Sequence, residues 1–506
     1  MKRVLVIAGS DSSGGAGLEA DQRVLAAHSC YALTATTALT AQNTLGVQDI
    51  HVVPTAFVRK QINAGLEDIG ADVVKIGMLA SAETAEMVSD ALRQHQVPSL
   101  VIDPVMISTS GSQLLPSEAV KIVREKLLPI TTILTPNIPE AVLLLRDSGA
   151  ADVKSPQSLD EAIQLAKQLF SLGPKYVLLK GGHLPLTAEY TTAGNNRDAS
   201  IVVDVLYDGK DVTLFESEFL TSKNTHGTGC SLASAIAANL AGGMDVVRAV
   251  RAACRFVEAG IKTSSDMGKG HGPINHFHSL YLLPFAPGRF LEYVLDRPDV
   301  KPAWKEFTEH PFVAGLANGT LPLEKFKHYL VQDYLYLVHF ARSNALAAYK
   351  HTDMEGIAMS ARIVLHIEQE MALHLDYCES FGLSKEDIES CKETQACTAY
   401  SRYILDVGQS EDWLALQVAL APCLIGYGAI AKRLHQDETS IRTDNKYWKW
   451  IENYVADDYQ QAVAAGSKLL ESRMRSVSPT RMEELIKIFV RATELEISFW
   501  GMGLEG

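Results

Sequence analysis

The first half of the chain alternates short apolar runs with longer amphipathic segments. Five apolar runs end in turn residues: "RVLVIAG", "VVKIGML", "SLVIDPVM", "TILTPN" and "YVLLKGG". Segments between them, such as "SAETAEMVSDALRQH" and "LDEAIQLAKQLFSLG", repeat apolar residues at helical spacing. This alternation predicts an α/β fold, with a parallel-sheet core and helices on both faces. Ligands of such sheets bind at the carboxyl ends of the strands.

The second half of the chain has few strand signals, and Gly and Pro are sparse in its periodic segments. Three segments repeat apolar residues at spacings of three and four: "LEKFKHYLVQDYLYLVHFARSNALAAYK", "GIAMSARIVLHIEQEMALHLDYCESFG" and "SPTRMEELIKIFVRATELEISFWGM". This pattern predicts an all-α helical bundle.

The composition changes between the two halves. All five tryptophans lie beyond residue 303, whereas 15 of the 19 prolines lie at or before Pro302. Four prolines cluster between residues 284 and 302. We therefore predict an α/β domain over residues 1–283, a proline-rich linker over 284–302 and a helical domain over 303–506.

The charge and cysteine content narrow the classes of partner. A formal net charge of −14 argues against nucleic acid or an anionic membrane as partner, but it allows a small phosphorylated ligand. The N-terminal apolar run is too short for a secretory signal, and we expect no stretch near the ~20 apolar residues of a membrane span. Seven cysteines form no C-x-x-C pair, which indicates reduced thiols in the cytoplasm.

The stretch "NTHGTGCS" runs directly into the helix-like segment "LASAIAANLAGG". No Walker-type phosphate loop occurs in the chain, but a helix N-terminus with bare amides also binds anions. Gly227, Thr228 and Gly229 would supply those amides. Cys230 follows in the first turn, where the helix dipole would lower the thiol pKa and allow the thiolate to take a proton from an alcohol. The alternative is that Cys230 is a small packing residue at a tight helix start.

The first half resembles the hydroxymethylpyrimidine/phosphomethylpyrimidine kinases of the ribokinase superfamily. Eight motifs occur in the family's order over almost all of residues 1–283: "AGSDSSGGAGLEAD", "TALTAQNT", "KIGML", "DPVM", "TPNIPEA", "KGGH", "HGTGC" and "GHGPINH". The resemblance implies a ribokinase-like fold and ATP with Mg²⁺ as cofactors. It also implies that Cys230 is the base beside the substrate hydroxyl, next to an anion hole formed by Gly227, Thr228 and Gly229.

The same resemblance assigns phosphate and metal roles. Lys180 would steady the ATP phosphates, and Asn137 and Glu140 would organise Mg²⁺ and its waters with help from Asp103. From the residues alone two other readings stay open. Asp103 and the following Pro104 could form a plain strand-end turn, and Asn137 with Glu140 could cap a helix.

The resemblance also assigns substrate contacts. Asp21 and the loop from Gly9 to Gly17 would close over the substrate. Gln42 is similar to the residue that reads the aminopyrimidine ring. An amide suits that task because it can donate to a ring nitrogen and accept from an exocyclic amine.

In the second half, "QDYLYLVHF" places Asp333, Tyr336 and Phe340 on one face of a helix. Burying a carboxylate among aromatic residues on the core-facing side of a helix costs free energy unless the carboxylate binds a partner. The motif "ALAPCLIGYG" places Cys423 directly after Pro422, which predicts a helix N-terminus there and a thiolate. The alternative is a set of core cysteines and tyrosines.

This half resembles the TenA/thiaminase II family over about residues 303–506, through "QDYLYLVHFAR", "PCLIGYG" and "ELEISFW". The resemblance implies attack of Cys423 on a 4-aminopyrimidine ring, proton transfer by Glu496 and recognition of the ring by Asp333. The aromatic pocket would be formed by Tyr336, Tyr400 and Tyr454. Phe340 departs from the family pattern, in which many members carry Tyr.

Together the two resemblances imply a bifunctional enzyme of thiamin biosynthesis and salvage. The helical half would hydrolyse thiamin or aminomethyl-pyrimidine, and the α/β half would phosphorylate the released hydroxymethylpyrimidine with ATP. Family resemblance further implies a homo-oligomer. The alternative is a pyridoxal-type kinase with a non-catalytic helical ligand-binding domain.

Overall fold

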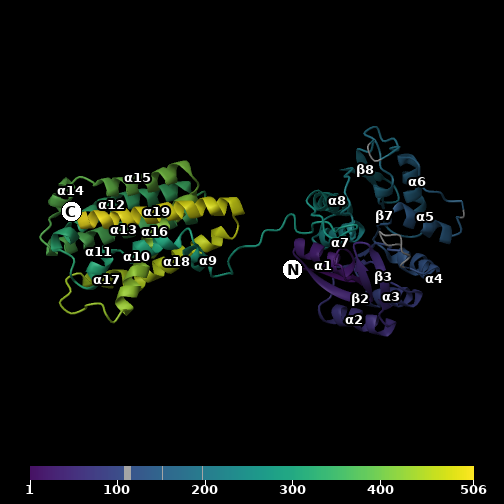
Figure 1. Cartoon of the computed structure of the whole chain (residues 1–506), viewed down its shortest axis with the longest axis horizontal. Coiled ribbons are helices and arrows are strands. Elements are labelled where there is room, and N and C mark those ends of the chain that lie inside the picture. Colours follow the sequence, from purple (N-terminus) through teal and green to yellow (C-terminus); the bar gives the residue numbers. More distant parts are fainter. Residues whose placement is uncertain (107–114, 151, 196–197, 506) are drawn as a thin grey trace. The chain divides into compact units, whose positions relative to one another are not determined.

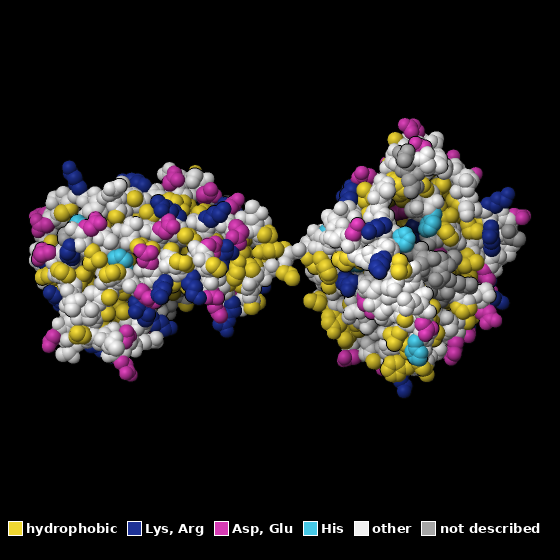
Figure 2. All heavy atoms as spheres, in the orientation of Figure 1, with side chains coloured by type: hydrophobic (Ala, Val, Ile, Leu, Met, Phe, Trp, Pro, Cys, Tyr) yellow, Lys and Arg dark blue, Asp and Glu magenta, His cyan; other side chains and the backbone are white. Residues whose placement is uncertain are grey.

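The computed structural model describes residues 1–106, 115–150, 152–195 and 198–505. The chain forms two compact units, Met1–Leu280 and Tyr281–Gly506 (Figure 1). Lys and Arg are scattered among Asp and Glu on the visible face of each unit (Figure 2).

The first unit is built on a twisted sheet whose described strands follow the order β3-β2-β1-β4-β5-β6-β7-β8-β9. The strands are β1 (Lys2–Asp11), β2 (Cys30–Asn43), β3 (Gly46–Val52), β4 (Val73–Ile76), β5 (Leu100–Ile102), β6 (Ile133–Leu134), β7 (Tyr176–Leu179), β8 (Ile201–Tyr207) and β9 (Val212–Glu218). The six strands from β2 to β7 in this order are parallel, while β3, β8 and β9 run antiparallel to their neighbours. The five predicted apolar runs are β1 and β4 to β7, so the parallel core is confirmed.

Helices cover both faces of this sheet, as predicted. Alternate side chains of β1 point to opposite faces. Val4 and Val6 pack with residues of α1, α7 and α8, whereas Leu5 and Ile7 belong to the core formed with α2 to α6. The helices are α1 (Gly17–Ala27), α2 (Thr55–Asp68), α3 (Ala82–His95), α4 (Ser117–Ile122), α5 (Ile138–Asp147), α6 (Leu159–Phe170), α7 (Thr228–Ala241) and α8 (Val246–Lys262).

The second unit is a bundle of helices around an aromatic core, which confirms the all-α prediction. The long helix α12 covers the predicted segment from Leu323 to Lys350, and α16 packs against α12, α15, α17, α18 and α19. The helices are α9 (Phe290–Asp296), α10 (Lys301–Thr308), α11 (Pro311–Ala317), α12 (Leu323–Lys350), α13 (Met354–Ser380), α14 (Lys385–Ser390), α15 (Gln395–Ser410), α16 (Trp413–Gln436), α17 (Trp448–Val455), α18 (Asp457–Met474) and α19 (Pro479–Glu505).

Much of the predicted linker, residues 284–302, is part of the second unit. It contains α9 and the first residues of α10, and the structure divides a few residues earlier, after Leu280. Phe285, Phe290 and Val294 are buried in the same core cluster as residues of α16 and α19. Apolar side chains between the prolines thus anchor this stretch to the bundle.

One expectation about apolar length needs correction. Among the described residues, the 24-residue helix α16 is long and apolar enough to cross a membrane, because an 18-residue apolar window within it has a mean hydropathy of 1.8. A proline usually indicates a helix start, and Pro422 therefore predicts a shorter helix, whereas it lies inside α16. In the structure 72% of the apolar window is buried, since α16 is the central helix of the bundle.

Candidate active sites

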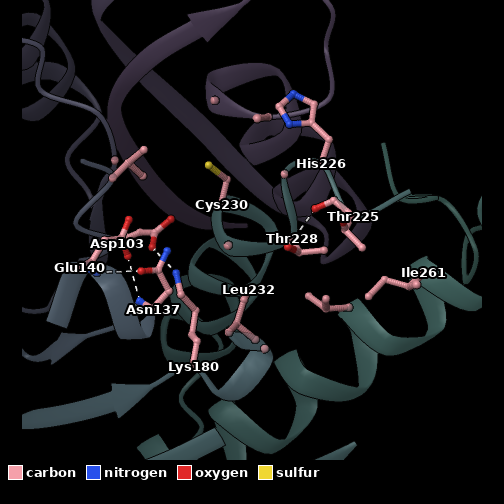
Figure 3. A pocket seen from close by; sticks show the side chains of 18 of the residues that line it. Asp103, Asn137, Glu140, Lys180, Thr225, His226, Thr228, Cys230, Leu232 and Ile261 are labelled. Atoms are coloured by element: carbon pink, nitrogen blue, oxygen red, sulfur yellow. Dashed lines mark hydrogen bonds and ion pairs between the residues drawn. The ribbon is translucent and has the colours of Figure 1, made fainter. Parts of the chain in front are cut away.

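A cavity of about 680 Å³ opens in the first unit where the parallel strands end. Asp103 and Lys180 directly follow β5 and β7, Asn137 lies three residues after the end of β6, and all three line the cavity. The helix start at "HGTGC" closes another side (Figure 3). The structure thereby brings together ten predicted residues in one cavity: Gly9, Gln42, Asp103, Asn137, Glu140, Lys180, Gly227, Thr228, Gly229 and Cys230.

The phosphate-binding end of this cavity combines a helix start with an ammonium group. Helix α7 begins at Thr228 after Gly227, and the first amides of a helix have no preceding helical carbonyl to bind. The Lys180 Nζ lies 2.7 Å from Asp103 Oδ1. A Cβ at Gly229 would lie 3.1 Å from Lys180 Nζ, so the helix backbone approaches this ion pair closely. The Lys180 ammonium and the start of α7 therefore line the same space.

We expect Gly227→Ala to destabilise the first unit by about 3 kcal/mol or more, because a Cβ there would overlap the Gly15 carbonyl oxygen. Gly227 also has a φ of +80°. Gly243→Ala is the matched control, since Gly243 has a φ of +90° but open space around it and should lose only ~1–2 kcal/mol. Thermal unfolding followed by circular dichroism measures both variants. Equal losses would contradict the overlap.

Asn137 and Glu140 form a capping box at the start of α5, as the helix-cap alternative for these two residues predicted. Glu140 N donates to Asn137 Oδ1, and Asn137 N donates to Glu140 Oε2, both at 2.9 Å. Burial raises the pKa of Glu140 to about 7, although Lys180 opposes the rise. With Asp103 they offer two carboxyls and an amide, which fits Mg²⁺ held by few carboxylates together with phosphates and waters. Among the described residues no cluster of three His, Cys, Asp or Glu residues suits a metal ion.

Cys230 lies in the first turn of α7, but the predicted low thiol pKa is wrong. Burial raises the pKa of Cys230 to about 12, and Asp21 and Asp103 add to the rise while Lys75 opposes it. Loss of solvation thus outweighs the helix dipole. The thiol is protonated at neutral pH in this structure.

Asp21 is not among the described residues that line the cavity, so the structure gives no support to its predicted contact with the substrate. Helix α1 turns this carboxylate into the interior, where it is fully buried. Both of its oxygens accept from Lys75 Nζ, at 2.9 and 2.8 Å, and Ser234 Oγ donates to it at 2.7 Å. Lys75 does line the cavity, and no role was predicted for it. A lysine in the apolar run "VVKIGML" was the available signal, because a buried charge needs a partner.

The other end of the cavity contains Gln42. Its Nε2 lies 3.2 Å from His226 Nε2, and the same ring nitrogen lies 2.9 Å from Asp11 Oδ2. His226 belongs to the "HGTGC" motif, yet the sequence analysis assigned it no role. Only the fold shows that it reaches the end of β1.

In the second unit, predicted residues from four helices converge. Tyr400 on α15 donates from its hydroxyl to Glu496 Oε1 on α19 at 2.7 Å. Cys423 on α16 interacts with Glu496 and with Tyr336 of α12. Tyr427, one turn after Cys423, also interacts with Glu496 and was missed, although a spacing of four on one helix was a usable signal.

The predicted thiolate at Cys423 is wrong. Pro422 lies inside α16 rather than at its start, so Cys423 has no helix N-terminus beside it. Burial raises the pKa of Cys423 well above its usual value, and the carboxyls of Glu496 and Asp333 add to the rise. The resting nucleophile is therefore a neutral thiol.

The remaining predicted residues of this unit lie in the same cluster. Asp333 is buried, and its Oδ2 lies 3.9 Å from His374 Nδ1. The rings of Tyr336 and Tyr400 stack with centroids 4.9 Å apart. Tyr454 also lies near these residues. Burial raises its pKa, and the nearby Asp333 and Cys423 add to the rise.

Burial raises the pKa of Glu496 to about 8, and Asp333 adds to the rise while hydrogen bonds from Tyr400 and Cys423 oppose it. The carboxyl is thus protonated at neutral pH. The Tyr400 hydroxyl donates to Oε1 of this carboxyl.

This raised pKa predicts a pH dependence of stability. Between pH ~4.5 and ~8 the unfolded carboxyl is ionised while the folded one keeps its proton, so stability falls as the pH rises. We expect the second unit of Glu496→Gln to lose less stability than wild type between pH 5 and pH 8. All five tryptophans lie in this unit, so fluorescence-detected urea unfolding reports it selectively. Parallel pH profiles for the two proteins would contradict the raised pKa.

Fold and cavity together define the first unit as a ribokinase-like small-molecule phosphotransferase, and the second unit as a helical bundle with a buried thiol–carboxyl pair. Comparison with known families agrees. The phosphomethylpyrimidine kinase model matches residues 11–275, and the TENA/THI-4/PQQC family model matches residues 297–506. The chain belongs to the phosphomethylpyrimidine kinase family and carries a C-terminal TENA/THI-4/PQQC domain.

Relatives share this two-part arrangement. A Schizosaccharomyces pombe protein named as a hydroxymethylpyrimidine/phosphomethylpyrimidine kinase is 44% identical, over 98% of this chain and 90% of its own length. The hydroxymethylpyrimidine/phosphomethylpyrimidine kinase THI20 of Saccharomyces cerevisiae is 34% identical, over 99% of this chain and 95% of its own length. An ADP complex of Bacillus subtilis pyridoxal kinase is 34% identical and covers 55% of this chain and 98% of its own, with a TM-score of 0.48.

Proposed function

We propose that the first unit phosphorylates 4-amino-5-hydroxymethyl-2-methylpyrimidine and its monophosphate with ATP and Mg²⁺. The observation that carries this proposal is that Lys180, the first turn of α7 and Gln42 line one cavity. The amides and the ammonium suit the charge of a transferring phosphoryl group, and a carboxamide suits an aminopyrimidine edge. The full-length relatives that carry this kinase name support it over a pyridoxal-type kinase.

Each part of the cavity has a task in this reaction. Apolar side chains of Leu220, Val257 and Ile261 line the end that would take the adenine ring. Bound Mg²⁺ would neutralise phosphate charge, and Glu140 and Asp103 would hold it directly or through water. These tasks leave the Gln42 end of the cavity for the pyrimidine.

Cys230 would contact the acceptor alcohol and orient its oxygen toward the γ-phosphorus. The new phosphorus–oxygen bond forms as the bond to the ADP oxygen breaks. Phosphoryl transfer proceeds through a loose transition state, in which the attacking oxygen develops little charge. Its proton can therefore leave late, to an oxygen of the transferred phosphoryl group or to water, and a protonated Cys230 is compatible with the reaction.

We propose that the second unit hydrolyses thiamin or aminomethyl-pyrimidine to hydroxymethylpyrimidine. The Cys423 sulfur would bond to a ring carbon beside the substituted methylene. Glu496 would give its carboxyl proton to the ring nitrogen while the resulting carboxylate takes the thiol proton, so no charge is separated. Departure of ammonia, or of the thiazole when thiamin is the substrate, would be followed by addition of water and release of the thiol, which leaves a hydroxyl in place of the leaving group. Asp333 would hold the amino group and the neighbouring ring nitrogen.

We also propose that the protein is a cytoplasmic homo-oligomer with small-molecule partners only. The family resemblance supports the oligomer, and seven cysteines without a disulfide support a reducing compartment. Light scattering of the purified chain tests the oligomer.

Phosphorus NMR tests the kinase proposal directly. Incubation of the purified chain with hydroxymethylpyrimidine, ATP and Mg²⁺ should yield first the monophosphate and then the diphosphate of the pyrimidine. Phosphorylation of pyridoxal in preference to hydroxymethylpyrimidine would contradict the proposal.

A further inference from the structure

The substrate end of the kinase cavity contains a buried hydrogen-bond chain that begins at Asp11. Both carboxylate oxygens of Asp11 are occupied. Oδ1 accepts from Ser13 N and Oγ at 2.8 Å, and Oδ2 accepts from Gly15 N at 3.1 Å and Ala16 N at 2.8 Å. Burial favours the neutral form, yet hydrogen bonds from His226, Ser13 and Ala16 lower the pKa of Asp11. Asp11 is thus a fixed carboxylate that only accepts hydrogen bonds.

A carboxylate acceptor determines the proton position on His226. The 2.9 Å contact between Asp11 Oδ2 and His226 Nε2 requires a proton on that nitrogen. A protonated Nε2 has no lone pair, so the Gln42 amide atom 3.2 Å away cannot donate to it and must be an acceptor that shares this one N–H with Asp11. This places the Gln42 oxygen, not its nitrogen, toward His226, an assignment that rests on hydrogen-bond logic.

The other neighbour of Gln42 requires the same orientation. The Thr40 hydroxyl donates to Ser10 O at 2.9 Å, so its single proton is used. Its Oγ1 lies 3.2 Å from the other atom of the Gln42 amide and can only accept from it. The Gln42 nitrogen therefore faces Thr40. One N–H and one oxygen lone pair of the amide remain for a ligand.

Packing holds the ring of His226 in place. A Cβ at Gly15 would overlap the imidazole, and one at Gly227 would overlap the Gly15 carbonyl. The loop after β1 and the segment before α7 are thus interlocked, and His226 is buried between them.

We propose that His226, held by Asp11, is a positioning residue that orients the Gln42 carboxamide and so determines which hydrogen-bonding order the substrate ring must present. This inference rests on the proposed kinase function. The fixed amide complements a ring nitrogen that accepts beside an amino group that donates. A 4-oxo ring presents the opposite order, with an N–H beside a carbonyl, and leaves both amide groups unpaired.

The test compares two ligands of the full chain. One is hydroxymethylpyrimidine, and the other is its 4-oxo analogue as a competitive inhibitor. We expect His226→Phe to raise the KM for hydroxymethylpyrimidine by ~10–100-fold with kcat changed less than ~threefold, because the amide can rotate. The inhibition constant of the 4-oxo analogue should stay unchanged or fall. His226→Gln keeps an N–H donor for Asp11 and should restore part of the discrimination.

His276→Phe is the matched control. His276 is equally buried, and its Nε2 lies 3.0 Å from Ser231 Oγ of α7, but it does not line the cavity. His276→Phe should leave unchanged the ratio of the KM for hydroxymethylpyrimidine to the inhibition constant of the 4-oxo analogue. If His226→Phe also leaves that ratio unchanged, the positioning role is overturned while the kinase function stands. A wild-type chain that does not phosphorylate hydroxymethylpyrimidine overturns the proposed function itself.

A second measurement is independent of turnover. Long-range ¹H–¹⁵N spectra of the histidine-labelled chain show which ring nitrogen bears a proton, with His226 assigned by the loss of its signals in His226→Phe. We expect a proton on Nε2. A bare Nε2 would overturn the inference.

Discussion

Replacing Cys423 with alanine should lower the hydrolysis of aminomethyl-pyrimidine by at least about 10³-fold in kcat and leave phosphorylation of hydroxymethylpyrimidine unchanged. Cys423 is the thiol that interacts with the protonated Glu496 carboxyl in the second unit. Without the sulfur no covalent bond to the ring can form. The two proposed activities belong to separate compact units, so hydrolysis should be lost while phosphorylation is kept.

Cys397→Ala is the control for this prediction. Cys397 is also a buried thiol of the second unit, but its sulfur contacts Gln332 O at 3.6 Å rather than Glu496. Ammonia release and pyrimidine phosphate formation are measured on the same preparations. Equal loss of hydrolysis in both variants would show a packing role for Cys423, as the core-cysteine reading of the sequence holds.

Lys180→Met should lower kinase kcat by about 10²–10³-fold, because the ammonium faces the same space as the α7 amides, where phosphoryl charge would develop. The change also leaves Asp103 without its partner at 2.7 Å. Lys180→Met combined with Asp103→Asn removes that unpaired carboxylate. Because Asp103 is also proposed to hold Mg²⁺, Asp103→Asn alone is measured beside it. If the double variant recovers thermal stability but has a kcat well below that of Asp103→Asn, the further loss belongs to the missing ammonium.

Lys175→Met is the control for charge on the same strand. Lys175 precedes β7, is exposed, and lies at the opposite end of that strand from Lys180. It should keep wild-type kinetics. A Lys180→Met enzyme with normal kcat would contradict the assignment of the phosphate end of the cavity.

The sequence sufficed to predict the elements whose signal is local. The strands β1 and β4 to β7 are buried on both faces of the sheet, so each appears in the sequence as a continuous apolar run. Such a run can be recognised without knowing which strands lie beside it. Residues that end parallel strands, such as Asp103 and Lys180, meet at one edge of the sheet by topology alone. The resemblance to known families added the thiol and carboxyl of the helical unit, and the structure brings these together.

Properties that depend on burial could not be predicted in the same way. A helix dipole is visible in sequence at Cys230, whereas the desolvation that outweighs it is a tertiary effect. Asp21 follows a glycine-rich loop, and only the rotation of α1 turns it toward Lys75. Pro422 usually indicates a helix start, but here it lies within α16, and 72% of the apolar window of that helix is buried.

The measurement that tests the central claim most directly is mass spectrometry of products from the full chain incubated with 4-amino-5-aminomethyl-2-methylpyrimidine, ATP and Mg²⁺. If both units act as proposed, hydroxymethylpyrimidine diphosphate should accumulate, and Cys423→Ala should abolish it unless hydroxymethylpyrimidine is added. Accumulation of free hydroxymethylpyrimidine without any phosphate would contradict the kinase assignment. Unchanged starting material, from a chain that still phosphorylates added hydroxymethylpyrimidine, would contradict the hydrolase.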